Sequence, residues 1–254
     1  MKSILSIPLE TALRILGYLS FVDVCSISMV SRESRQLSLH VLFRAVTLSR
    51  NTRVVMDGLL EEHGGIKSSI RHLKIAEPYW ASVGGQNPTS QILQLVRRLD
   101  NLVSLSLCRA GFVDLKDIPN LNESLKQTSV EELSLHVSSG TSAAAVYGPS
   151  GLRRIQLQWA VGDGPSSHAH LIQFLTPSLP TLVELDITGC RWELFFNFRD
   201  QQQPVYPGMR SFKSRTNGRD TAELRAYAKM FPNLVTFDFS FMSIEPNRVQ
   251  WAVS

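Results

Sequence analysis

The residues best suited to catalysis or metal binding are sparse in this sequence of 254 residues. His168 and His170 form the closest histidine pair, and Asp163 is the nearby carboxylate. A zinc site needs three or four ligands, so we interpret this segment as a solvated loop and expect neither a metal nor a cofactor. The sequence also lacks a phosphate-binding loop, G-x-G-x-x-G, G-x-S-x-G and H-E-x-x-H. We therefore expect a protein that is not an enzyme.

The bulk composition is typical of a folded protein that is neither secreted nor membrane-spanning. Hydrophobic residues make up 43% of the chain and charged residues 19%, and the net charge is +4. Cys25, Cys108 and Cys190 are far apart and odd in number, which favours reduced core residues in the cytoplasm and/or nucleus. We expect no signal peptide and no membrane partner, because charges interrupt the first apolar run and no apolar run reaches the roughly 18 residues of a membrane span.

The first 40 residues predict a cluster of short helices with more apolar surface than so small a unit can bury. Pro8 suits the first turn of a helix that carries apolar side chains on most of its faces. Ser20 with Asp23 indicates a capping box for a second helix, and Ser31 can cap a third. Units of this size rarely fold without a partner, and exposed apolar surface is usually an interface. The segment therefore predicts a site of attachment to another protein.

Residues 7 to 35 resemble an F-box, the helical motif that binds an Skp-family adaptor in cullin-RING ubiquitin ligases. The family pattern Leu-Pro-x-Glu, Ile-Leu-x-x-Leu, Asp-Leu and Val-Ser-Arg runs along them without a gap, with Ile7 in place of the first leucine. Ser34 stands where the family usually has tryptophan. The resemblance implies that the first two helices make the main adaptor contacts, and the adaptor-binding residues we expect are Ile7, Pro8, Leu9, Ile15, Leu16, Leu19, Val24 and Val30. The alternative is an ordinary helical cap on a larger domain.

Beyond residue 40 a six-residue pattern recurs: apolar, two variable, apolar, one variable, apolar. Its copies start at residues 43, 70, 102, 130, 152, 182, 209 and 234, and the copy at 209 is degraded because Ser214 occupies its last apolar position. Intervals of roughly 20 to 30 residues with this pattern are the signature of a leucine-rich-repeat solenoid. The alternation of the last apolar residues indicates a strand with one buried face.

The segments between these copies predict helices and loops. Apolar residues at helical spacing predict helices over 92–99, 171–175 and 220–231. Segments rich in small or polar residues predict loops over 137–149 and 201–204. The fold class we expect is α/β, with parallel inner strands and outer helices.

This division predicts a two-part chain. An F-box helical module would occupy residues 1–40, and an irregular leucine-rich-repeat solenoid would occupy residues 41–254.

Strand residues between the buried positions of a solenoid face its concave side, which such proteins use for binding. Three rows would cross this side: Ser104, Glu132, Arg154, Glu184, Ser211 and Thr236; Ser106, Ser134, Gln156, Asp186, Lys213 and Asp238; Cys108, His136, Gln158, Thr188, Arg215 and Ser240. The client-binding residues we expect are Arg154, Gln156, Gln158, Trp159, Asp186, Lys213 and Asp238, with Trp192 near the edge. The alternative is a strip of solvated charges that neutralise one another.

The resemblance implies a non-catalytic substrate-recognition subunit of an SCF-type ubiquitin ligase, which links an Skp-family adaptor to a protein client. One alternative is a repeat scaffold without a ligase role. Another is a nucleic-acid-associated protein that uses a basic edge at 210–229, formed by Arg210, Lys213, Arg215, Arg219, Arg225 and Lys229. Acidic residues dilute that edge and no aromatic residues alternate with its charges, so we do not expect a nucleic-acid partner.

Overall fold

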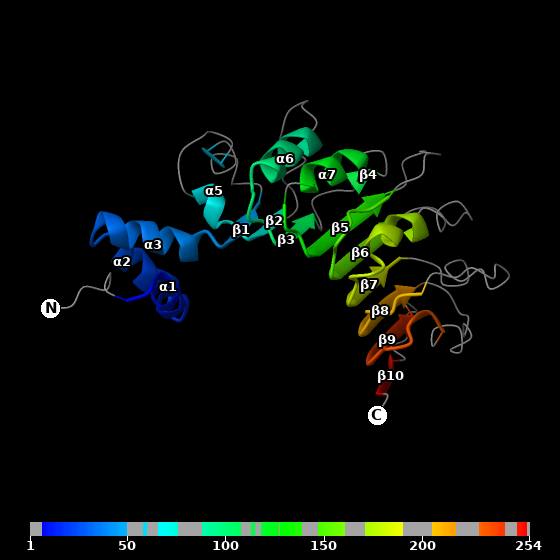
Figure 1. Ribbon diagram of the computed structural model, residues 1–254. Helices are drawn as coiled ribbons and strands as arrows, with labels where there is room; N and C mark the ends of the chain where they lie inside the picture. The colour runs from blue at the N-terminus through cyan, green and yellow to red at the C-terminus, as the bar shows by residue number, and fades with distance from the viewer. Residues whose placement is uncertain are drawn as a thin grey trace.

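The protein is described by a computed structural model. It describes residues 7–49, 58–59, 66–75, 88–107, 113–114, 118–126, 128–138, 147–160, 171–189, 205–216, 229–241 and 248–252. A group of helices at the N-terminal end adjoins a curved sheet whose strands follow one another in chain order (Figure 1). Among these residues no helix has both the length and the apolar character needed to cross a membrane.

The second and third N-terminal helices begin where the sequence predicts them, whereas Pro8, expected in the first turn of the first helix, is the extended residue just before it. The three helices are α1 (Leu9–Gly17), α2 (Phe21–Ser28) and α3 (Arg32–Leu42). The Ser20 hydroxyl accepts a hydrogen bond from the Asp23 amide at 3.2 Å, and the Ser31 hydroxyl accepts one from the Ser34 amide at 3.1 Å. Both bonds satisfy amides that have no partner within their helix, so both predicted caps are confirmed.

Eight parallel strands form most of the sheet among the described residues. They are β1 (Ala45–Leu48), β2 (His72–Ile75), β3 (Ser104–Leu107), β5 (Glu132–Ser138), β6 (Arg154–Ala160), β7 (Glu184–Thr188), β8 (Ser211–Thr216) and β9 (Thr236–Phe241). The short strand β4 (Val113–Asp114) pairs with β5. The sequence did not predict β10 (Arg248–Ala252), which pairs antiparallel with β9.

The register of the strands follows the six-residue pattern. The middle apolar residues of its copies pair across the sheet in the order Val46, Leu73, Leu105, Leu133, Ile155, Leu185, Phe212 and Phe237. Side chains of a strand alternate between two faces, so this register places the apolar set together on one face. The resulting α/β architecture is compatible with a helical module followed by a repeat solenoid.

Helices cover the apolar face of the sheet (Figure 1). They include α5 (Ile66–Ser69), α6 (Pro88–Arg97), α7 (Ile118–Leu125), a helical segment at 171–175 and the 3₁₀ turn Thr176–Ser178. The helix expected over 92–99 is α6, which ends at Arg97, and the helix expected over 171–175 is present.

Three segments expected from the sequence lie partly or wholly outside the described residues. Val137 and Ser138 belong to β5 and not to the expected loop, and Val137 is fully buried, whereas residues 139–146 lie outside the described residues. Most of the helix expected over 220–231, and all of the loop expected over 201–204, lie outside the described residues.

Candidate interaction surfaces

Large hydrophobic side chains lie exposed on the N-terminal module, the three helices α1 to α3. Most of the exposed large hydrophobic residues in the described part of the chain belong to it: Leu9, Ile15, Tyr18, Leu19, Phe21, Val22, Met29 and Val30. Tyr18 is 81% exposed and Val30 is 77% exposed. A patch of this kind on a small helical unit is a protein-binding surface. We call these eight residues the apolar patch.

The structure separates the expected adaptor-binding residues into two groups. Leu9, Ile15, Leu19 and Val30 belong to the apolar patch, Pro8 is exposed and Ile7 is half-buried. Leu16 and Val24 are each only 1% exposed, so in the unbound chain they pack the helices together.

Sequence reasoning missed four members of the apolar patch. Tyr18, Phe21, Val22 and Met29 lie at or next to helix ends, where the helical spacing used to define apolar stripes gives no guide to exposure. The signal that could have found them is the run of large apolar residues on both sides of the Ser20 cap.

Small side chains occupy the buried face of α3. Ser34 and Ser38 are both buried, at 8% and 0% exposure. The Ser31 hydroxyl donates to the Ser34 hydroxyl at 3.1 Å, whereas the Ser38 hydroxyl is buried without a hydrogen-bond partner among the described residues. The residue in place of the usual tryptophan therefore helps to cap α3.

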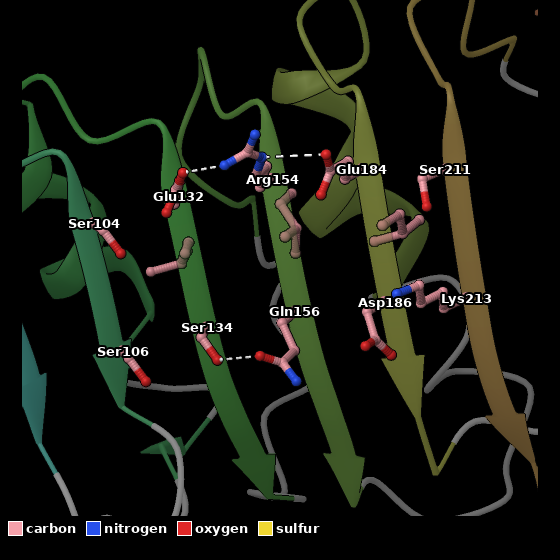
Figure 2. A pocket seen from close by; sticks show the side chains of 13 residues that line it. Ser104, Ser106, Glu132, Ser134, Arg154, Gln156, Glu184, Asp186, Ser211 and Lys213 are labelled. Carbon is pink, nitrogen blue, oxygen red and sulfur yellow. Dashed lines mark hydrogen bonds and ion pairs between the residues drawn. The ribbon is translucent and has the colours of Figure 1, made fainter. Parts of the chain in front are cut away.

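A polar hollow of about 360 Å³ lies on the inner face of the sheet, over β3 and β5 to β8 (Figure 2). Arg154 lies at its centre, 2.6 Å from Glu132 and 3.3 Å from Glu184. These two carboxylates, Glu184 foremost, raise the pKa of Arg154 above its usual value. Beside this triad the Ser134 hydroxyl donates to the Gln156 amide oxygen at 3.1 Å. The expected rows are in register wherever the structure describes them.

The charge in this hollow is unevenly compensated. Carboxylates flank Arg154 on both sides. This arrangement agrees with the alternative that the charges of this row are solvated and neutralise one another. Asp186 differs: burial raises the pKa of its carboxyl, while the charges of Arg215 and Lys213 oppose the shift and that of Asp238 adds to it. Burial therefore disfavours the charged form of Asp186, which lines the polar hollow.

The remaining client-binding residues are only partly described. Gln158 is exposed in register with His136 and Thr188, and Asp238 is half-buried in β9. Trp159 lies in β6 in register with Val137, and its side chain is outside the described part of the structure. Trp192 lies entirely outside it.

Several other residues considered in the sequence also lie outside the described residues: Cys108, Cys190, Asp163, His168, His170, Arg219 and Arg225. Cys25 is a half-buried free thiol. Within the described ranges no group of three or more potential metal ligands occurs. Of the expected basic edge, the structure describes Arg210, Lys213, Arg215 and Lys229. An Arg210 nitrogen donates to the Asn233 carbonyl at 3.4 Å.

Comparison with known families identifies the N-terminal module. Residues 4–46 match the F-box domain, a range that contains α1, α2 and α3 and reaches into β1. The F-box resemblance is thereby confirmed, while the strands beyond residue 46 lie outside that match. No match to a curated protein was found. F-box domains typically bind Skp-family adaptors, and F-box proteins are generally non-catalytic adaptor subunits, so the match suggests an adaptor-binding subunit of an SCF-type ligase.

Proposed function

We propose that this chain is a substrate-recognition subunit of an SCF-type cullin-RING ubiquitin ligase. Its F-box would bind an Skp-family adaptor and, through it, the cullin, and its sheet would hold a protein client. The observation that carries the proposal is the apolar patch, which lies within the residues that match the F-box. A partner surface that packs closely on these side chains would remove them from water, and the core of such interfaces is usually apolar.

The size of the exposed side chains supports a stable complex. Full burial of one large aliphatic or aromatic side chain stabilises a complex by about 1.5–3 kcal/mol. We expect Tyr18 and Phe21 to be the strongest anchors, because they are exposed aromatic side chains and aromatic residues often carry a large share of binding energy. The buried Leu16 and Val24 support the patch from beneath by holding α1 and α2 in place.

The client would bind the inner face of the sheet, in the polar hollow. Gln156, Asp186 and Lys213 line it, whereas the charge of Arg154 is already met by neighbouring carboxylates. Gln158 and Asp238 extend the same rows. The chain would take no part in the chemistry of ubiquitin transfer and would contribute the proximity and orientation of the client.

The proposed location is the cytoplasm and/or nucleus. Ubiquitin ligases of this class act there, and the sparse, unpaired cysteines of the sequence suit a reducing compartment.

Co-purification tests the ligase role. The tagged chain, expressed in cells, should recover an Skp-family adaptor together with a cullin. The pair Leu19→Asp and Val30→Asp places charges in the apolar patch at exposed positions and should abolish recovery. The control pair Thr11→Asp and Gln36→Asp adds the same charge at exposed polar positions of α1 and α3 and should recover both proteins. Absence of the adaptor from the wild-type sample would refute the proposal.

A second experiment tests the client surface separately. For a client whose ubiquitination depends on the wild-type chain, the pair Asp186→Ala and Lys213→Ala should reduce ubiquitination while adaptor recovery stays unchanged. Val235→Ala with Tyr147→Ala alters exposed side chains away from the hollow and serves as the control. Full ubiquitination by the Asp186 and Lys213 pair would exclude this face.

A further inference from the structure

A second cleft, of about 960 Å³, lies between the F-box module and the start of the sheet. Residues of α1 and α3 form one side of it, and residues next to α5, β1 and β2 form the other. These elements adjoin one another at the N-terminal end of the sheet (Figure 1). The polar hollow described above is at a different place, over β3 to β8.

Hydrogen bonds join the elements that form the walls of this junction cleft, and one of them links the F-box module to the sheet part. His40 on α3 contacts the Ser69 hydroxyl on α5 at 2.8 Å, and the Asn101 amide donates to the Ser68 carbonyl at 2.8 Å. The Arg44 carbonyl accepts from the amides of Arg71 and His72, each at 2.9 Å. These bonds connect the elements on the two sides of the cleft.

Positive charge dominates the lining of the cleft. Arg14, Arg44 and Arg71 line it together with a single carboxylate, Glu10. All three arginines are exposed, and among the described residues none of them forms an ion pair. By contrast, Arg153 and Arg154, farther along the sheet, each lie within ion-pair distance of a glutamate. The junction cleft thus carries uncompensated positive charge.

The strand register makes this imbalance sharper. Arg44 and Arg71 each precede a strand of the parallel pair β1 and β2, and the backbone bond between them makes them lateral neighbours. Like charges on neighbouring strands destabilise a sheet. Farther along the same row Glu131 adjoins Arg153, and their side chains are 3.8 Å apart. The row thus contains an ion pair at Glu131 and Arg153, and Arg210 of the same row donates to the Asn233 carbonyl. Arg44 and Arg71 are the two arginines that lie side by side in it, and a bound anion would offset their charge.

The apolar part of the lining indicates what kind of anion fits. Leu9, Leu13 and Val41 line the same cleft, and its described lining includes His40 and His72 but no phenylalanine, tyrosine or tryptophan. Single-stranded nucleic acid is usually held by basic residues together with aromatic side chains that stack on its bases. A peptide that alternates acidic and aliphatic side chains matches both the arginines and the aliphatic residues.

We propose that the junction cleft binds an acidic peptide segment of a partner protein, with its carboxylates on Arg14, Arg44 and Arg71 and its aliphatic side chains on Leu9, Leu13 and Val41. This site shares Leu9 with the apolar patch and is otherwise made of different residues, so the arginine variants test it without altering the rest of the patch or the polar hollow.

Fluorescence anisotropy tests the proposal with the full chain and a short labelled peptide in which glutamates are interspersed with leucine and serine. The chain should bind this peptide but not its counterpart with glutamine in place of every glutamate. The pair Arg44→Gln and Arg71→Gln should weaken binding by about tenfold or more. The matched pair Arg153→Gln and Arg210→Gln, from the same row and with the same change of charge, should bind as the wild type does.

Three results would overturn the proposal: equal binding of the glutamine peptide, equal loss of binding in both pairs of variants, or tighter binding of an oligothymidylate at the same arginines. A thermal melt of the unbound protein checks the charge argument independently of the peptide. Removal of one of two neighbouring like charges should raise the melting temperature of Arg44→Gln. A lower melting temperature would show that this charge is already compensated, which would contradict the proposal.

Discussion

At the scale of single residues, the F-box module shows that an apolar residue in a binding motif is not always an exposed one. Leu16 and Leu19 both fit the family pattern, yet Leu16 is 1% exposed and Leu19 is 38% exposed. Helix α1 places Ala12 and Leu16 toward the other helices, since residues four apart share a helix face. A substitution at Leu16 therefore tests folding, and a substitution at Leu19 tests binding.

The first prediction follows from that difference. Leu16→Ala should destabilise the F-box module by about 3 kcal/mol, because it leaves a cavity between the helices. Leu19→Ala should change its stability by less than about 1 kcal/mol, because that side chain is already in water. Chemical denaturation followed by circular dichroism measures both. Equal losses in the two variants would contradict the packing described here.

The second prediction concerns the carboxyl of Asp186. Burial raises the pKa of this group above its ordinary value of 3.8, so the ionised form destabilises the folded chain. That penalty is fully present above the raised pKa and disappears as the pH falls below 3.8, where the folded and unfolded chains are both protonated. Asp186→Asn should therefore raise the melting temperature at neutral pH and change it less in acid.

Melts of both proteins across this pH range measure the effect of Asp186. Glu184→Gln is the control, because it removes a partner of Arg154 and should not raise the melting temperature at neutral pH. A gain for Asp186→Asn that grows toward acid would have the wrong sign for a buried carboxylate.

At the scale of elements, the sequence predicts those parts whose residues repeat. The apolar pattern predicts the strands β1 to β9, β4 apart, because alternating burial requires a period of two, and the caps Ser20 and Ser31 predict two helix starts. Strand β10 could not be predicted in this way, because it pairs antiparallel and continues no repeat. The exposure of the apolar patch also required the structure, since a helix that is apolar on several faces does not indicate which face its neighbours cover.

The third prediction compares two glycines in different elements. A Cβ at Gly148 would overlap the Phe174 carbonyl oxygen, which accepts a hydrogen bond from the Gly148 amide. A Cβ at Gly17 would meet nothing within 4 Å. Gly148→Ala should cost about 2 kcal/mol, because the backbone must shift to relieve the overlap. Gly17→Ala should be neutral or slightly stabilising. Denaturant titrations of the two variants decide the matter, and a neutral Gly148→Ala would contradict the close approach.

The fourth prediction concerns the degraded copy of the pattern in β8. Ser214 is 1% exposed, and its hydroxyl has no hydrogen-bond partner among the described residues. Ser214→Val removes that hydroxyl and restores an apolar residue, so it should stabilise the chain by about 1 kcal/mol. Ser211→Val on the other face of the strand is the control and should not produce this gain. Loss of stability in Ser214→Val would show that the site has no room for the added methyl groups.

At the scale of the whole molecule, the two parts differ in how they present their residues. The F-box module exposes large apolar side chains, whereas the inner face of the sheet exposes charged and amide groups held in register. The first arrangement suits a stable partner that removes the apolar side chains from water, and the second suits a partner selected by its polar groups. At the junction, His40 of α3 contacts the Ser69 hydroxyl of α5 and so joins the two parts. A client held on the sheet would then keep a defined direction relative to the adaptor.

The central claim is that the apolar patch is the adaptor-binding surface, and calorimetric titration of the purified chain with an Skp-family adaptor tests it most directly. We predict saturable binding that is weakened at least about a hundredfold by Val30→Asp, which places a charge at a 77% exposed position in the interface. Gln36→Asp, at an exposed polar position of the same module, should bind like the wild type. Val30→Asp that folds normally and binds the adaptor as tightly as the wild type would contradict the claim.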